Sequence, residues 1–239
     1  MALTVKLKNR TEVAAGTMAF HFEKPRNFAF TPGQAGDFSL DNPPETDAEG
    51  NKRAFSLASA PYENDLVIAT RMRDTAFKRS LKAIPLGTEF ALDAPWGELT
   101  LHEDTSIPAV FLTGGIGITP VRSIVLQATR DKLDQNIVLF YSNHTPQDAP
   151  FLDELIAAQS ANPHFTLVAT MTKMEKSAQP WHGETGFIDK AMLTKFLDDL
   201  TIPIYYVTGP PTMVNAMQKM LTEAGVKAAN VRAEEFSGY

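Results

Sequence analysis

Residues 113–120, Thr-Gly-Gly-Ile-Gly-Ile-Thr-Pro, have the composition of a phosphate-binding turn. They follow an apolar strand pattern and precede a segment with apolar residues at helical spacing. Gly114, Gly115 and Gly117 allow a tight turn and the close approach of a ligand, and Pro120 suits a first helical turn. Amides at the start of a helix attract phosphate groups. The segment predicts a nucleotide site, and a plain strand-to-helix turn is the alternative.

A second motif, Arg-Ala-Phe-Ser-Leu-Ala-Ser at residues 53–59, lies upstream in a region with a β pattern. Together the two motifs resemble the ferredoxin–NADP reductase superfamily, whose flavin domain carries Arg-x-Tyr-Ser and whose nucleotide domain opens with Gly-Gly-x-Gly-Ile-Thr-Pro. Phe55 stands where the family has Tyr, so one hydroxyl is absent. The resemblance covers nearly the whole chain and implies that FAD is the bound cofactor and NAD(P)H the co-substrate.

The residue types at 53–56 suit a flavin, which needs a fixed cation, an apolar or aromatic face and a small hydrogen-bond donor. On a strand, Arg53 and Phe55 point to one face while Ala54 and Ser56 point to the other. The resemblance implies that Arg53 holds a flavin phosphate, that Phe55 packs near the ribityl chain and ring, and that Ser56 donates near the reactive nitrogen. A half-buried strand with Arg53 on a solvated edge is the alternative.

Residues 71–81 resemble the family's second phosphate-binding segment, in which a turn leads into a short helix that ends in Ser. The family has glycines in this turn, whereas this chain has Asp74, Thr75 and Ala76. A solvated helix face is the alternative for the two cations within the helix. The residues assigned to the cofactor here are Arg71, Lys78, Arg79 and Ser80.

The nicotinamide side draws on residues 113–120, 141–143 and 207–214, each at or just after a predicted strand end. The resemblance places Thr119 where nicotinamide and flavin meet, so Thr119 and Ser56 are expected to orient the rings. Besides the three glycines, the residues assigned to the nucleotide are Ile118, Thr119, Pro120, Ser142, Asn143, Gly209, Pro210, Pro211 and Met213.

The chain ends in Glu-Glu-Phe-Ser-Gly-Tyr. This segment resembles the family's terminal element, which brings an acidic residue and an aromatic ring towards the flavin. Glu234, Glu235 and Phe236 are the candidates, with Glu235 as the acidic group and Phe236 as a gate over the flavin. In the alternative, Phe236 caps the last strand and Tyr239 extends into solvent.

The residues that distinguish NADH from NADPH are expected just beyond the second strand of the nucleotide domain. A carboxylate there would bind a free ribose hydroxyl, and a cation would bind a 2′-phosphate. Ser142 and Asn143 provide neither group. Lys173 and Lys176 suit a 2′-phosphate, but solvated lysines are common in such loops, and the preference stays open.

The first hundred residues contain short alternating segments separated by turn residues, which is typical of an antiparallel barrel. The predicted strands are 3–7, 18–22, 37–40, 54–58, 66–71, 89–92 and 99–101. Residues 41–52 are acidic and rich in turn formers, and they predict an exposed loop that either lies beside the flavin or is an inert insertion.

The second half alternates strands with longer helices, which predicts a parallel sheet covered on both faces. The expected strands are 109–113, 137–142, 165–171, 204–208 and 230–235, and the helices are 119–130, 151–161, 190–197 and 211–224. The chain therefore predicts two domains, an N-terminal antiparallel Greek-key barrel at 1–104 that binds flavin and a C-terminal α/β Rossmann-like domain at 105–239 that binds the nicotinamide nucleotide.

Composition excludes several chemistries. The 239 residues include no cysteine, so disulfides, thiolate-ligated clusters and a Cys nucleophile are excluded, and any iron–sulfur partner must be another polypeptide. The histidines lack metal-ligand spacing, so no metal site is expected. A net charge of −6 without a basic run argues against nucleic acid. With no apolar signal or membrane-spanning run in the sequence, a cytoplasmic location without membrane insertion is expected.

The expected function is hydride transfer from NAD(P)H to bound FAD, followed by release of electrons to an unidentified acceptor, a redox protein or a small molecule. The first alternative is a free-flavin or ferric reductase, in which flavin is a substrate. Another is a non-catalytic module that holds FAD or a nucleotide and senses redox state. A third is a component of a larger redox complex.

Overall fold

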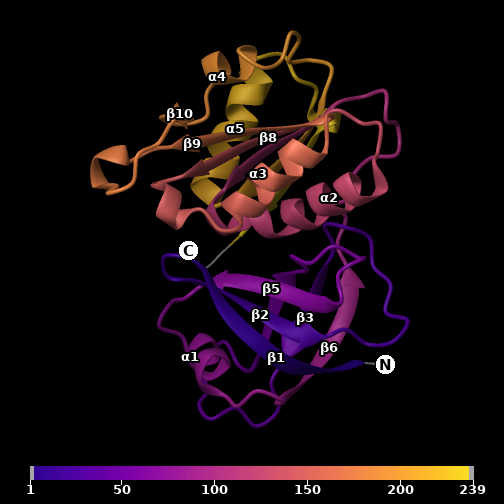
Figure 1. Cartoon of the computed structure of the whole chain (residues 1–239), viewed down its shortest axis with the longest axis vertical. Helices are drawn as coiled ribbons and strands as arrows, with labels where there is room; N and C mark the ends of the chain where they lie inside the picture. The colour runs from indigo at the N-terminus through magenta and orange to yellow at the C-terminus, as the bar shows by residue number, and fades with distance from the viewer. Residues whose placement is uncertain (1–2, 237–239) are drawn as a thin grey trace.

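The computed structural model describes residues 3–236, which form two six-stranded sheets stacked along the long axis of the molecule (Figure 1). The N-terminal sheet is antiparallel and the C-terminal sheet is parallel. The predicted fold class, a β-barrel followed by an α/β domain, is therefore confirmed.

The N-terminal sheet has the strand order β4-β3-β6-β1-β2-β5. Its end strands β4 and β5 contact each other, so the sheet curls into a barrel. Its elements are β1 (Leu3–Ala14), β2 (Thr17–Glu23), β3 (Ala35–Ser39), β4 (Lys52–Ser56), β5 (Asp65–Arg71), α1 (Ala76–Ala83) and β6 (Glu89–Trp96).

Aromatic side chains fill the barrel. Phe22 packs against Phe38 and Phe90 with ring centroids 5.0 and 5.1 Å away, and all three are buried. Phe77 and Leu81 of α1 belong to the same core, so this helix closes one end of the barrel. The alternation of apolar and polar residues along the strands thus gives the barrel an inner and an outer face.

The C-terminal sheet has the order β10-β9-β8-β7-β11-β12. Its strands and α-helices are β7 (Ala109–Gly114), α2 (Ile118–Asp131), β8 (Ile137–Asn143), α3 (Leu152–Ala161), β9 (Phe165–Met171), β10 (Glu184–Thr185), α4 (Lys190–Thr194), β11 (Ile204–Gly209), α5 (Pro211–Glu223) and β12 (Val231–Glu235). Short 3₁₀ turns occur at η1 (Gly115–Gly117), η2 (Pro146–Asp148), η3 (Met174–Lys176) and η4 (Ala228–Asn230).

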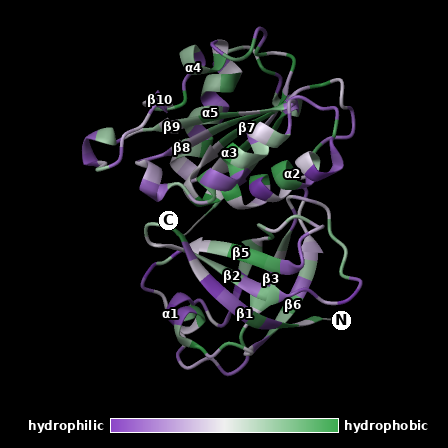
Figure 2. Ribbon diagram, viewed as in Figure 1, coloured by the Kyte–Doolittle hydropathy of each residue, from purple (hydrophilic) through white to green (hydrophobic). Residues whose placement is uncertain are grey.

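Helices cover both faces of the parallel sheet, and Figure 2 shows its strands as an apolar layer between them. Phe111 of β7 packs with α2 and α3, while its neighbours Val110 and Leu112 pack with α4 and α5. The α2 face also packs on the barrel, because Ala58 and Leu99 belong to the same core as Phe111. A strand buried on both faces reads as a continuous apolar run, as residues 109–112 do.

Most predicted elements are present with ends shifted by one or two residues. The strand expected at 99–101 is absent, and these residues are an irregular segment between the sheets. β1 extends to Ala14, well beyond residue 7, because it pairs with β6 at its start and with β2 further on. β10 was not predicted, since its two residues give no pattern. The chain passes between the sheets from Trp96 to Ala109, and the division at residues 104 and 105 stays a prediction.

Within residues 3–236, no helix is long and apolar enough to cross a membrane. The same residues contain no cluster of His, Cys, Asp or Glu suited to a metal ion.

Candidate functional site

Two cavities meet between the domains. The barrel cavity, of about 450 Å³, is lined from β4, β5, α1 and the turn before α2. The sheet-edge cavity, of about 680 Å³, lies at the carboxyl ends of the parallel strands. Arg71 and Arg73 line both cavities, so they form the shared wall.

The barrel cavity brings together predicted residues from four segments of the sequence: β4, the segment from Arg71 to Lys78, the start of α2, and the described end of the chain. Those that line it are Arg53, Ala54, Phe55, Ser56, Arg71, Lys78, Thr119 and Phe236. All four residues of 53–56 line it, although alternate side chains of a strand point to opposite faces, and β4 is an end strand of its sheet. Ser56 is only 5% exposed, and Phe55 packs against Phe38 and Phe77, with ring centroids 6.0 and 6.1 Å away.

Arg53 is held by the loop at 41–51. Its Nη1 donates to the carbonyls of Glu49 and Gly50 at 2.9 and 3.1 Å, and its Nη2 lies 2.9 Å from the Glu49 carboxylate. The guanidinium also stacks over Phe77, 5.2 Å from the ring centroid. Glu49 itself lines the barrel cavity, so this loop is part of the site.

Asp47, in the same loop, lies at the start of α1. Its Oδ2 accepts a hydrogen bond from the amide of Ala76 at 2.9 Å. This bond lowers the pKa of Asp47, and so do a second hydrogen bond from the Glu49 amide and the positive charge of Arg53. A carboxylate thus lies where a helix N-terminus and an arginine attract an anion.

The cations of α1 have different surroundings. The Lys78 ammonium donates to the Arg71 carbonyl at 2.8 Å, and burial, with the charges of Arg73 and Arg53, lowers its pKa. Arg79 is not brought to either cavity, because it faces outward and pairs with Glu45 and Asp74. Ser80 also lies outside both cavities, since it is on the buried side of the helix and is 1% exposed.

The glycine-rich turn links β7 to α2 through η1. Gly115 has φ +52°, a conformation that favours glycine. A Cβ on Gly117 would lie 2.6 Å from the Thr208 carbonyl oxygen, so this glycine lets the turn pack against β11. Thr119 is 2% exposed, and its hydroxyl donates to the Ile116 carbonyl at 3.0 Å.

Besides Arg71, six of the residues assigned to the nucleotide line the sheet-edge cavity, namely Gly114, Gly115, Ser142, Asn143, Pro210 and Met213. Asn143 is 6% exposed, and its Nδ2 is buried without a hydrogen-bond partner among the described residues. Because a buried donor without a partner is costly, this amide suits a ligand acceptor.

Some residues assigned to the nucleotide do not line either cavity. They are Gly117, Ile118, Pro120, Gly209 and Pro211. Ile118 is fully buried in the core beneath the turn, and Gly209 and Pro211 end β11 and begin α5. These residues shape the turns that carry the lining residues.

The described end of the chain reaches the site through Phe236. This ring lines the barrel cavity, and its amide donates to the Gly209 carbonyl at 2.9 Å. Glu235 does not line either cavity, and its carboxylate lies 3.5 Å from the Asn215 side-chain amide, whereas burial raises the pKa of Glu234. Tyr239 lies outside the described residues.

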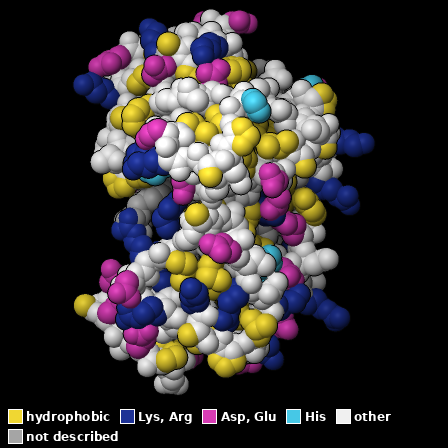
Figure 3. Space-filling model, turned by 60° about the vertical axis from the view of Figure 1, so that its left-hand side comes forward, with side chains coloured by type: hydrophobic (Ala, Val, Ile, Leu, Met, Phe, Trp, Pro, Cys, Tyr) yellow, Lys and Arg dark blue, Asp and Glu magenta, His cyan; other side chains and the backbone are white. Residues whose placement is uncertain are grey.

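Arg73 is the main lining residue that sequence reasoning missed. The sequence holds a signal for it, because Arg73 comes two residues after Arg71, just beyond the end of the predicted strand 66–71. Neither guanidinium forms an ion pair within residues 3–236, and Figure 3 shows Lys and Arg side chains gathered at the level between the domains. His144, Thr172 and Phe187 line the sheet-edge cavity and were also missed.

Of the two lysines considered for nucleotide choice, Lys173 lies beside this cavity. The Lys173 ammonium is 3.4 Å from Nε2 of His144, while Lys176 ends η3. Burial and the charge of Lys173 lower the pKa of His144. Neither lysine lines the cavity.

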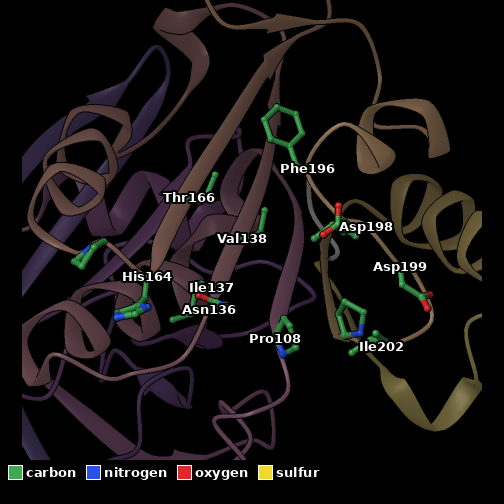
Figure 4. A pocket seen from close by; sticks show the side chains of 13 residues that line it. Pro108, Asn136, Ile137, Val138, His164, Thr166, Phe196, Asp198, Asp199 and Ile202 are labelled. Atoms are coloured by element: carbon green, nitrogen blue, oxygen red, sulfur yellow. The ribbon is translucent and has the colours of Figure 1, made fainter.

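A third cavity, of about 320 Å³, lies at the opposite end of the parallel sheet (Figure 4). Asn136 and His164, which line it, immediately precede β8 and β9, so they mark the amino ends of the strands. In open α/β sheets, ligands bind at the carboxyl ends, which favours the first two cavities.

The chain is similar to known proteins both in part of its sequence and in its fold. Residues 111–219 match the family described as the oxidoreductase NAD-binding domain. The glycine betaine monooxygenase reductase subunit of Chromohalobacter salexigens is 25% identical over 224 residues, which is 92% of this chain and 60% of that protein. A component of the Na⁺-translocating NADH-quinone reductase of Pseudomonas aeruginosa is 31% identical over 205 residues, 78% of this chain and 49% of that one. The chain therefore spans about half to three-fifths of these relatives' length.

The fold is also shared with a solved structure, a ferredoxin NADP⁺ reductase from Neisseria gonorrhoeae with bound FAD and NADP. The TM-score is 0.79 at 21% identity, and the match covers 98% of each chain. At this identity the likeness shows the two-domain fold.

Proposed function

We propose that this chain is a flavoprotein reductase of the ferredoxin–NADP reductase superfamily, because it shares its fold with a ferredoxin NADP⁺ reductase and matches the oxidoreductase NAD-binding domain over residues 111–219. It binds FAD in the barrel cavity and a nicotinamide nucleotide in the sheet-edge cavity. The observation that carries the proposal is the wall of Arg71 and Arg73 shared by the two cavities, since a dinucleotide in one then ends beside a flavin in the other.

The barrel cavity has the groups that a flavin needs. Phe55 offers an aromatic face and Ser56 a hydroxyl, and Arg53 and Lys78 offer cations for phosphate. Phe55 has no hydroxyl for the ribityl chain, so its role is packing. The loop carboxylates of Asp47 and Glu49 compete with a phosphate for Arg53.

The sheet-edge cavity suits a nicotinamide nucleotide. The unpartnered Nδ2 of Asn143 fits a ribose or amide oxygen, and the Gly114–Gly115 backbone allows close approach of a phosphate to the start of α2. The two arginines of the shared wall carry charge that complements the diphosphate.

Hydride transfer between nicotinamide and flavin is the chemistry that the two bound groups themselves supply. The protein holds the two reacting rings in position, and such positioning accounts for a large share of the rate of an enzymatic reaction. Ser56 and Thr119 line the barrel cavity from the barrel and from α2, respectively, and orient the rings. Phe236 lines the same cavity and has to move aside for the nicotinamide to stack.

The electron acceptor is another molecule in this proposal. Two relatives carry names of reductase subunits, one of a monooxygenase and one of an NADH-quinone reductase, which supports a protein acceptor. A free-flavin reductase is the second candidate, favoured by the contacts that already occupy Arg53, since they weaken retention of FAD.

The experiment is to purify the protein, record its visible spectrum, and add NADH or NADPH without oxygen in a stopped-flow instrument. We expect a bound flavin that bleaches rapidly with one nucleotide, which also identifies the preferred nucleotide. A colourless protein that reduces added flavin would favour the second candidate. Bound flavin that neither nucleotide reduces would contradict the proposal.

A further inference from the structure

We infer that Arg122 of α2 is a positioning residue that sets the separation of Thr119 and Ser56 across the domain boundary. The inference rests on the proposed function, because it concerns the two sides between which hydride is transferred. It is carried by a cluster of contacts one helical turn away from the barrel cavity.

Arg122 joins its own helix α2 to the segment between β4 and β5 and to α3. Its Nη1 donates to the Ala58 carbonyl at 2.7 Å, and its two terminal nitrogens pair with the Glu63 carboxylate at 2.9 and 3.1 Å. Its Nε donates to the Glu154 carboxylate of α3 at 3.2 Å. The residue is only 5% exposed, so these contacts hold a buried cation between the barrel and the α/β domain.

The order of residues along the two segments ties this cluster to the site. Arg122 and Ser123 follow Thr119 by three and four residues, which places them one turn further along the helix. Their partners Ala58 and Ser59 follow Ser56 by two and three residues, and the Ser123 hydroxyl donates to the Ser59 carbonyl at 2.8 Å. The two segments therefore run alongside each other from the cavity to the cluster.

The contacts of the Arg122 side chain hold its guanidinium in a single orientation. Its planar guanidinium binds Glu63 through two nitrogens, and its carbon atom lies 4.9 Å from the centroid of the Phe151 ring. Burial opposes the charge, but the bonds and attraction of Glu63 and Glu154 outweigh it and raise the pKa of Arg122. The cation therefore persists at every working pH, and a lysine, which lacks the planar fork, would not reproduce these paired contacts.

The test compares FAD-loaded wild-type protein with Arg122→Met, Arg122→Lys, Ser123→Ala and Gln127→Ala. Gln127 is the matched control, since it lies on the same helix and accepts a hydrogen bond from the Tyr62 amide across the boundary, further from the cavity. The measurements are the rate constant of flavin reduction at saturating nucleotide, the long-wavelength absorbance of the stacked nicotinamide–flavin pair, and the melting temperature.

We expect Arg122→Met to slow flavin reduction by about ten- to a hundredfold, the loss typical of a small misplacement of reacting groups, and to weaken the long-wavelength band. Arg122→Lys should recover part of the rate, because it keeps the charge without the fork. Gln127→Ala should match the wild type, and dithionite should reduce the flavin fully in all five proteins.

Wild-type rates in Arg122→Met, with only a lower melting temperature, would overturn the inference while leaving the proposed function intact. If Arg122→Met does not fold, wild-type rates in both Arg122→Lys and Ser123→Ala would overturn it instead. A wild-type flavin that neither nucleotide reduces would overturn the proposed function and this inference together.

Discussion

The carboxylate of Asp47 lies 3.5 Å from the guanidinium of Arg53 and at the same time accepts a hydrogen bond from the first residue of α1. The start of α1, beside the barrel cavity, thus already holds a negative group from the protein. A flavin phosphate that binds to Arg53 has to compete with this carboxylate, and the outcome is measurable.

Replacing Asp47 by Asn should strengthen FAD binding by about two- to fivefold, the size of effect expected for an exposed ion pair. The amide keeps its hydrogen-bonding capacity but no longer competes through charge. Fluorescence titration of the flavin-free protein measures the dissociation constant. Asp41→Asn is the control, because Asp41 is exposed at the start of the same loop. Equal or weaker binding by Asp47→Asn would show that the loop supports the cofactor.

Arg53→Ala should weaken FAD binding by roughly ten- to a hundredfold, because hydrogen bonds to charged groups are the stronger kind. Arg26→Ala, which removes an exposed arginine of the same domain, should leave the affinity unchanged. In the Arg53→Ala background, Asp47→Asn should have little further effect, since the two groups act on each other. Additive effects in the double variant would contradict this coupling.

FAD affinity should fall as the pH rises towards the alkaline range. Burial lowers the pKa of Lys78, so this side chain loses its proton below the usual lysine range, and a neutral amine does not pair with phosphate. The dissociation constant is measured from about pH 7 to about pH 10, below the ordinary lysine value. Lys78→Arg should flatten the curve, because arginine stays charged. Identical curves for the two proteins would assign the titration to the flavin.

Gly117→Ala should destabilise the protein by about 1–3 kcal/mol, the usual cost of overpacking, and should weaken nucleotide binding. The new methyl group would meet the backbone of Thr208 and Gly209 and displace the turn. Gly87→Ala is the control, because Gly87 has φ +89° and open space around it, so only local backbone strain results. Urea unfolding and nucleotide titration check both. Unchanged nucleotide affinity in Gly117→Ala would separate the turn from the site.

Much of the fold follows from local patterns. The apolar run at residues 109–112 and Gly225, which follows the end of α5 at Glu223, are signals that act within a few residues, so the parallel sheet and its last helix were predictable. The prediction of a strand at 99–101 was wrong because it, too, rests on a local pattern alone. Its alternation is local, but Leu99 belongs to the core shared with α2, so tertiary packing replaces strand pairing there.

In the site, too, local motifs identified some residues, while contacts between distant residues were not predictable. Motifs identified Arg53, Ser56 and Thr119, which the fold brings to one cavity. The contacts of Asp47 with α1 join residues far apart in the sequence, and no local pattern reports such a pairing. Arg79 and Ser80 illustrate the limit, because helix periodicity alone does not say which side of α1 faces the cavity.

The core that contains α2 includes side chains from both halves of the chain, with Ala58 and Leu99 packed against the same helix as Phe111. This core joins the two domains, although the barrel also has a core of its own, so unfolding of one domain exposes apolar side chains of the other. Heating should therefore melt the barrel and the α/β domain in one cooperative transition. A domain cut out at the boundary would expose this apolar face to water, which makes aggregation the expected fate of either half.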